Sequence, residues 1–496
     1  MRMAFHSFQY LLFFLIVYII YIVLPHRFRY IWLLAASYFF YYCANACYVP
    51  LLLGITLLAW LSGIGIDHAR RRSKTILAKR LFVLAIIIDL GILCYFKYTG
   101  FLLDNLKHVT ALFQTDILTV IEGILPPLGI SFILFQSISY TIDVYRQTIS
   151  AERNAIKFAF YLAFFPKLVS GPIERAGTII EQLRSPIHLR LSDLKEGLSL
   201  ILMGLFLKLV LSDNIAAIIN PVFASWQNYS GLQIALAVVL FAFQIYGDFG
   251  GYSYIALGSA RILGFQLSNN FESPYHAESV SEFWTRWHIT LNNWLRDYLY
   301  IPLGGNRKGT LRKYVNTMIV FLLSGLWHGA EWTFVIWGGL NGLYIIAENV
   351  MKNTCKKAHR HKSPDENRFS THLRRRIITF LLIDFAWLFF CMPNLSSAFG
   401  MIRHAVTQPG IRELFNLGFL NLFPDITTFA VIILSLLILL WTDTIIYRER
   451  ISYTTFFFRQ SSAFRWLVSI VALCMIIFFG AYGDTYEQTQ FIYFQF

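Results

Sequence analysis

Two of the twelve histidines in this sequence stand apart because of the residues around them. His328 ends an apolar run, 321–329, which predicts that its imidazole lies at or near membrane depth, where an ionisable side chain is costly and usually functional. His288 follows a cluster of two tryptophans and an arginine at 284–287. An imidazole near neutral pH takes a proton from a hydroxyl and returns it to a leaving group, as acyl transfer requires. The alternative to a catalytic role is that each histidine is structural and bonds a backbone carbonyl. This alternative has more weight for His288 than for His328.

The residues after His288 extend this candidate site. In a helix, Asn292 and Arg296 lie on the face of His288, at i+4 and i+8. We predict that His328 and His288 are catalytic. We predict substrate contacts from residues of the same polar segments: Trp287, Asn292, Arg296, Asp297, Trp327 and Asp248.

Three other polar features have two interpretations each. Asp248 lies in a glycine-rich stretch, 246–252, that predicts a bend after an apolar span; it either orients a neighbouring His or Arg or caps a helix. The turn 304–306 precedes a basic cluster, which either meets the phosphates of a cytoplasmic acyl donor or anchors the chain at the membrane surface. Asp89 and Asp143 are acids flanked by apolar residues, and either line a polar path or bond a neighbouring helix. The basic cluster consists of Arg307, Lys308, Arg312 and Lys313.

Metal chemistry is not expected. The six cysteines stand at positions 43, 47, 94, 355, 391 and 474. Cys43 and Cys47 have helical spacing, but they lie in an apolar run without a nearby histidine pair. No carboxylate or third histidine recurs with ligand spacing around His288 and His328.

Composition predicts the elements that hold these residues. Of 496 residues, 56% are hydrophobic and 14% are charged, against roughly 25% charged in ordinary soluble domains. Aromatic residues reach 17%, a surplus suited to membrane interfaces. The sequence therefore predicts an all-α, polytopic transmembrane protein, and we interpret residues 1–496 as a single domain.

The positive charge orients the chain in the bilayer. The formal net charge is +14, and two connectors, 70–80 and 352–376, carry 13 of these charges. Short basic connectors between apolar spans are typical of cytoplasmic loops. Neither is interleaved with the aromatic residues that stack on bases, which argues against nucleic acid. We predict extracytoplasmic N- and C-termini, and a retained first span at 8–24 because no cleavage site follows it.

The apolar spans leave one polar interval in the middle of the chain. Several spans are shorter than the ~20 residues of a perpendicular crossing, which predicts tilted or re-entrant helices inside a bundle. Residues 266–313 are too polar to cross as one lipid-facing helix and are rich in Trp, His and Arg. We expect the chemistry in this segment. The predicted later spans are 31–43, 49–66, 81–98, 117–142 (broken at Pro126-Pro127), 156–170, 197–225 (in two pieces), 231–247, 314–327, 332–349, 377–391, 428–446 and 465–483.

Several motifs resemble the membrane-bound O-acyltransferase family, in particular its bacterial alginate O-acetyltransferase type. They cover most of the chain in order and include the histidine motifs at 281–291 and 326–329. The others are Leu128–Phe132, Asp143–Arg146, Phe165–Pro172, Gln244–Tyr252, Trp294–Asn306 and Phe491–Phe496.

This resemblance implies a multi-helix fold around a central tunnel, with the invariant family histidine at His328 and a second, more variable polar residue at His288. It implies a bacterial inner-membrane enzyme without a bound cofactor that uses acetyl-CoA as a cytoplasmic donor. It also implies an extracytoplasmic, hydrolase-like acetyltransferase as partner and a polysaccharide as final acceptor. Tyr254, Gly250 and Cys391 depart from the family pattern, which leaves the polysaccharide open. The alternatives are D-alanyl transfer to teichoic acid and a non-catalytic scaffold for polymer export.

Overall fold

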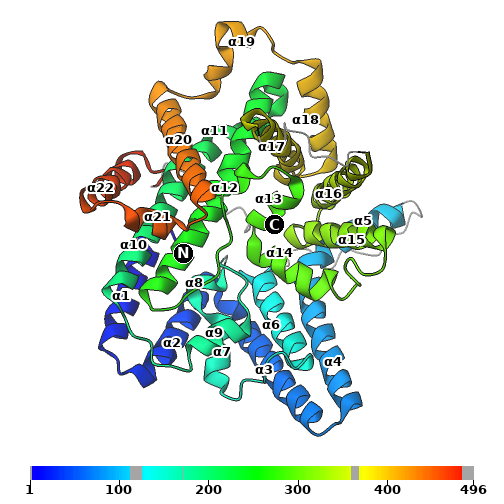
Figure 1. Ribbon diagram of the computed structural model, residues 1–496, viewed down its shortest axis with the longest axis vertical. Coiled ribbons are helices and arrows are strands. Elements are labelled where there is room, and N and C mark those ends of the chain that lie inside the picture. The colour runs from blue at the N-terminus through cyan, green and yellow to red at the C-terminus, as the bar shows by residue number, and fades with distance from the viewer. Residues whose placement is uncertain (1–2, 112–125, 170, 359–367, 483–496) are drawn as a thin grey trace. The chain divides into compact units, whose positions relative to one another are not determined.

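The computed structural model describes residues 3–111, 126–169, 171–358 and 368–482, which contain helices, connecting turns and one isolated β-bridge, but no strand. The all-α prediction is confirmed. The packing divides the chain into two compact units, 1–201 with 255–268 and 202–254 with 269–496. Figure 1 shows the order of the helices along the chain. The predicted break at Pro126-Pro127 borders residues outside this description, and the motif Phe491–Phe496 lies wholly outside it.

The first unit packs long N-terminal helices against shorter ones. The helix α3 contacts α4 and α6. Asp89 on α4 has a helix partner, because it accepts a hydrogen bond of 2.7 Å from the Ser137 hydroxyl on α6. The helices are α1 (Phe8–Val23), α2 (His26–Asn45), α3 (Val49–Arg71), α4 (Thr75–Leu93), α5 (Thr99–Ala111), α6 (Ile130–Tyr145), α7 (Ala155–Ala163), α8 (Phe165–Leu168) and α9 (Ala176–Gln182).

The helices α10 (Leu191–Leu205) and α12 (Gly231–Ile262) contribute residues to both units. The second unit contains every predicted site residue. Its other elements are η3 (a π-helix, Phe206–Ser212), α11 (Asp213–Ala224), η5 (Pro274–His276), α13 (Val280–Arg286), α14 (Ile289–Leu295), η6 (a π-helix, Arg296–Tyr300), α15 (Thr310–His328), α16 (Trp332–Ala358), α17 (Phe369–Cys391), α18 (Leu395–Thr407), α19 (Glu413–Asn416), α20 (Ile426–Glu449), α21 (Tyr453–Arg459) and α22 (Ser462–Phe479).

Six described segments are long and apolar enough to cross a membrane, so the chain is a multi-pass membrane protein. Most of the 191–224 segment is buried inside the protein, whereas almost none of α22 is, as expected for an outer helix that faces lipid. The polar interval 266–313 forms short helices and turns instead of one crossing, as predicted. The six segments are His26–Arg71, Leu191–Ala224, Gly231–Ile262, Trp332–Thr354, Ile426–Glu449 and Ser462–Phe479.

The predicted bend at 246–252 is wrong, because α12 continues through it to Ile262. The glycines allow close packing instead of a turn. A Cβ atom on Gly251 would lie 2.8 Å from the carbonyl oxygen of Gly204. Small residues at a helix contact let two backbones approach this closely.

Glycines also set the distance between α15 and α16. These two helices form a hairpin, and His328 is the last residue of the first helix. A Cβ atom on Gly325 would lie 2.2 Å from the Phe334 carbonyl oxygen, and one on Gly338 would lie 2.3 Å from that of Phe321. Real Cβ atoms do not approach carbonyl oxygens so closely, so neither position accepts a side chain without helix separation.

We expect Gly338→Ala to lower the unfolding temperature of the detergent-purified protein, with a cost of about 1–3 kcal/mol typical of overpacking. Gly339→Ala is the matched control, because a Cβ atom there meets only Leu322 at 3.6 Å. The control should keep or raise the unfolding temperature, since alanine favours a helix interior. Equal unfolding temperatures for both variants would contradict the close-packing explanation.

Candidate active site

His288 is held in a strained backbone conformation between two short helices. Its φ and ψ are 45° and 52°, in the left-handed region, and it forms the N-cap of α14. This conformation costs an L-residue other than glycine roughly 1–2 kcal/mol, and such strain concentrates at functional sites. The side chain is fully buried.

Neighbouring backbone contacts maintain this conformation. Phe271 and Trp287 form an isolated antiparallel bridge. The next amide, Ile289 N, donates to the Asn270 carbonyl oxygen at 3.0 Å. The Asn292 side-chain amide donates to the carbonyl oxygens of Trp287 at 2.6 Å and His288 at 3.2 Å. These bonds hold the backbone from which the imidazole of His288 projects.

His328 is the last residue of α15 and is 3% exposed. Its ring centroid lies 6.4 Å from that of His288. This spacing is about twice the reach of a catalytic hydrogen bond, roughly 2.6–3.2 Å. The two histidines, 40 positions apart in the sequence, are therefore close enough to act on neighbouring atoms of one reacting centre.

Aromatic rings from four long helices surround the two imidazoles. Phe249 of α12 lies 4.7 Å from the His288 ring centroid, and Trp337 of α16 lies 4.9 Å from that of His328. Trp327 of α15 lies 5.9 Å from His288 and 5.0 Å from His328. Phe390 of α17 lies 5.5 Å from His328. This enclosure lowers the local dielectric constant, which strengthens polar interactions with a substrate.

Burial also sets the protonation state of His288. Desolvation disfavours the imidazolium ion and lowers the pKa of His288 to about 3. The side chain is therefore neutral at pH 7. A neutral imidazole donates one hydrogen bond without carrying a charge.

Comparison with known proteins identifies the family. A sequence profile of the membrane-bound O-acyltransferase family (MBOAT) matches residues 20–392. The chain belongs to the membrane-bound O-acyltransferase family. It is 38% identical over 397 residues to the "Probable alginate O-acetylase AlgI" of Pseudomonas putida, with 80% of this chain and 79% of the relative covered.

Two further relatives carry other names. The "Peptidoglycan O-acetyltransferase" of Helicobacter pylori is 34% identical over 409 residues, covering 77% of this chain and 74% of the relative. The "Teichoic acid D-alanyltransferase" of Bacillus subtilis is 24% identical over 272 residues, covering 53% and 68%. The resemblance inferred from the motifs is confirmed, and this O-acyltransferase is of the alginate type.

The helical spacing predicted after His288 is wrong, because His288 lies outside α14 and a π-helix begins at Arg296. Asn292 bonds the backbone on either side of His288, which is a positioning role. The Arg296 side chain is 58% exposed and pairs with Asp297 at 2.8 Å. Because the left-handed backbone of His288 lies outside α14, helical i+8 spacing does not place Arg296 on its face.

Asp248 belongs to a buried ion cluster in the interior of α12, so the helix-cap interpretation is wrong. The Lys208 ammonium lies 2.7 Å from a carboxylate oxygen of Asp248 and 2.7 Å from one of Asp213. The next residue, Phe249, contacts the His288 ring. The cluster therefore anchors the part of α12 that packs on the candidate site.

Sequence reasoning missed several residues of this enclosure. Trp337 stacks on Trp387 with ring centroids 5.6 Å apart, and Trp387 lies 5.2 Å from Trp287. The Trp284 indole donates to the Asn341 side-chain oxygen at 3.1 Å, which joins α13 to α16. In the sequence, these residues could have been noticed only as tryptophans or polar residues inside apolar spans. Tryptophans that anchor a helix at the membrane interface show the same pattern, so it does not single out a site.

We expect His288→Ala to lower the kcat of acyl transfer by about 10²-fold, the loss typical of one donor to a developing oxyanion. His288→Asn should recover part of this activity, because asparagine tolerates the left-handed conformation and keeps a side-chain N–H. Both variants are assayed by release of labelled acyl groups from the donor. Wild-type turnover of His288→Ala would remove His288 from the site.

Proposed function

We propose that this enzyme moves an acetyl group from a cytoplasmic thioester, acetyl-CoA, to the extracytoplasmic side of the bacterial inner membrane for O-acetylation of a polysaccharide. A secreted, hydrolase-like acetyltransferase receives the group and passes it on to the polymer. The observation that carries the proposal is the pair of buried histidines, 6.4 Å apart inside an aromatic enclosure. The names of the alginate and peptidoglycan relatives support acetylation of a polysaccharide.

His328 is the general base of the proposed reaction. Its imidazole removes the proton from an acceptor hydroxyl, on a partner serine or a sugar, as the oxygen attacks the thioester carbonyl. A C–O bond forms, and the carbonyl oxygen becomes an oxyanion. The neutral His288 donates a hydrogen bond to that oxyanion. The C–S bond then breaks, and the departing thiolate receives the proton from the imidazolium of His328.

The enclosure supports this chemistry in two ways. Rings contributed by α12, α15, α16 and α17 surround the imidazoles, so bulk water has little access to the thioester. Exclusion of water suppresses hydrolysis and strengthens the hydrogen bond to the oxyanion. A buried histidine pair with these contacts is more than a non-catalytic scaffold requires.

The proposed donor and acceptor are tested with purified protein reconstituted in vesicles. Labelled acetyl-CoA is supplied on the face that carries the basic connectors, and label is measured in an acceptor on the opposite face. We expect acetyl transfer and no transfer from a D-alanyl thioester. Transfer of D-alanine alone would support the teichoic-acid alternative, and no transfer of either group would support the scaffold.

A further inference from the structure

A second group of polar residues surrounds Tyr447 and has no part in the reaction described above. One of its members, Arg286, lies two positions before His288 in the sequence. The guanidinium carbons of Arg286 and Arg376 lie 4.7 and 4.9 Å from the centre of the same ring, that of Tyr447. The His276 ring stacks on this ring at 5.4 Å. Arg448, at the end of α20, is close enough to act electrostatically on His276. Three groups, from α13, α17 and η5, therefore surround one tyrosine of α20, and Arg448 adds a fourth, cationic group nearby.

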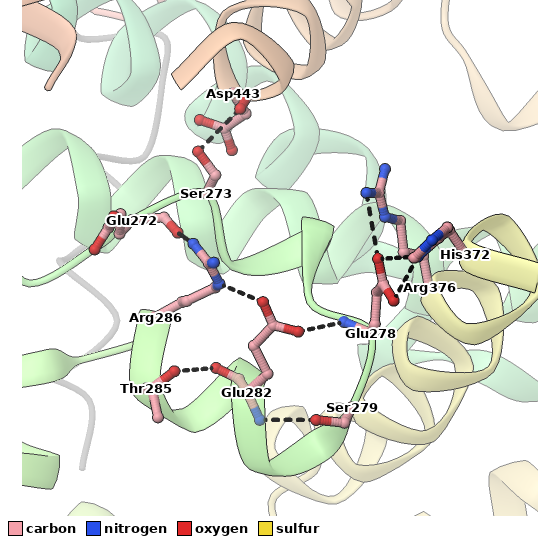
Figure 2. Close-up of polar contacts among 10 residues, drawn as sticks. All are labelled: Glu272, Ser273, Glu278, Ser279, Glu282, Thr285, Arg286, His372, Arg376 and Asp443. Carbon is pink, nitrogen blue, oxygen red and sulfur yellow. Dashed lines mark hydrogen bonds and ion pairs between the residues drawn. The ribbon is translucent and has the colours of Figure 1, made fainter. Parts of the chain in front are cut away.

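The acids near these arginines offset only part of their charge. Glu282 pairs with Arg286 at 2.9 Å. Glu278 contacts His372 at 2.8 Å and reaches Arg376 at 3.6 Å and Arg375 at 3.9 Å. Figure 2 shows the contacts of Arg286, Arg376 and His372 with these acids. It also shows the Glu272 backbone carbonyl, which accepts from Arg286 at 3.1 Å. The three arginines around Tyr447, Arg286, Arg376 and Arg448, against the two glutamates, Glu278 and Glu282, leave a net charge of +1.

Two buried nitrogen atoms of this group lack a hydrogen-bond partner among the described residues, Nδ1 of His276 and Nε of Arg376. His276 is 8% exposed. Its Nε2 lies 2.9 Å from the Thr444 hydroxyl, which itself donates to the Leu440 carbonyl oxygen. The threonine therefore accepts from His276 Nε2, which makes Nδ1 the unprotonated, hydrogen-bond-accepting nitrogen of the neutral ring. Buried polar atoms usually have partners, so such a pair indicates a bound group.

An oxyanion with several oxygens satisfies all of these features. It supplies the missing negative charge and accepts from Arg376 Nε, and a phosphate monoester that keeps one proton donates its O–H to His276 Nδ1. Guanidinium groups favour phosphate because its geometry matches their planar donors. The Arg286 and Arg376 side chains are 21% and 27% exposed, so the group is open to solvent on one side.

We propose that His276, Arg286, Arg376 and Arg448 form a phosphate-binding site beside Tyr447. The basic ends of α17 and α20 place this site on the cytoplasmic face by the positive-inside rule. Arg286 is two residues from His288, a backbone distance of at most about 7 Å. We assign this phosphate to the acyl donor, and this assignment rests on the proposed function. The headgroup of an anionic lipid also carries a phosphate and is the other ligand to be tested.

The donor arm of the test compares coenzyme A with pantetheine, which lacks the phosphates, as ligands of the full-length protein in phosphatidylcholine nanodiscs. We expect Arg376→Gln to weaken coenzyme A binding about tenfold and Arg448→Gln to weaken it about threefold. Pantetheine binding should change less than twofold in both, which also shows that the variants are folded. Arg374→Gln is the matched control, because Arg374 is an exposed residue of the same helix, and it should bind coenzyme A like the wild type.

The lipid arm measures phosphatidylglycerol retained by the same proteins in native mass spectrometry. Weaker coenzyme A binding in Arg376→Gln supports the phosphate site and assigns it to the donor. Loss of retained phosphatidylglycerol alone supports the site and assigns it to a lipid headgroup. Unchanged binding in both arms overturns the proposal. These readouts need no turnover, so they are independent of whether acetyl transfer itself is observed.

Discussion

His328→Ala is expected to lower the kcat of acetyl transfer by roughly 10²–10⁴-fold, the range that a positioned general base contributes. His328 lies at the end of α15 within an aromatic enclosure, with its ring centroid 6.4 Å from that of His288. No neighbouring imidazole occupies the same position, so the proton of the acceptor hydroxyl has no equivalent acceptor in the variant. The measurement is single-turnover release of labelled acetyl groups from the donor with acceptor present.

A loss of activity through misfolding must be separated from a loss of chemistry. His328→Gln keeps most of the side-chain volume and a hydrogen-bonding amide, but cannot accept the proton. It should elute and melt like the wild type and remain inactive. His188→Ala is the control for histidine removal, because His188 is exposed and lies in the first unit. Turnover near the wild-type rate in His328→Gln would refute the general-base assignment.

Lys208→Met is expected to cause the largest loss of stability, about 3–5 kcal/mol, because it leaves two buried carboxylates without their cation. Lys208 is 1% exposed and lies 2.7 Å from both Asp213 and Asp248. We expect a lower unfolding temperature and a lower yield of monodisperse protein. Acetyl transfer should also fall, since the Phe249 ring that packs on His288 follows Asp248.

Removal of the whole ion cluster should cost much less than removal of its cation. Uncharged side chains of similar size often replace a buried ion set with little effect on stability. The triple variant Lys208→Met, Asp213→Asn, Asp248→Asn should therefore melt above Lys208→Met. Lys195→Met, an exposed lysine of α10, should melt like the wild type. A triple variant less stable than Lys208→Met would contradict the uncompensated-charge explanation.

Some features of the fold and of the candidate site could be predicted from the sequence, because they depend only on composition and on short motifs. A charged fraction of 14% and the apolar runs were enough to predict a multi-pass helical protein. His328 stood out because one ionisable residue in an apolar run is costly wherever the run packs. The polar interval 266–313 was correctly predicted not to cross as one lipid-facing helix, since its polar and turn-forming residues do not suit such a span.

Local spacing failed where the backbone departs from regular geometry. The i+4 and i+8 pattern assumed that His288 lies inside a helix. Instead, the Ile289 amide bonds the Asn270 carbonyl oxygen and the Asn292 side chain bonds the backbone beside His288, which leaves His288 left-handed outside α14. The bend predicted at 246–252 ignored the neighbouring backbone that makes glycine useful inside a straight helix. Both errors arose because a partner outside the segment contributes to its geometry, the Asn270 carbonyl in the first case and the Gly204 backbone in the second.

By itself, the sequence determined the membrane class of this protein and its family and singled out His328 as a candidate, because these follow from residue types and motif order. Only the tertiary structure decided which side chains share the site. It brought His288 within 6.4 Å of His328, enclosed both with rings of four helices, and paired Asp248 with Lys208. Such contacts depend on how helices pack, and side-chain packing across long sequence separations leaves no periodic signal in a single chain.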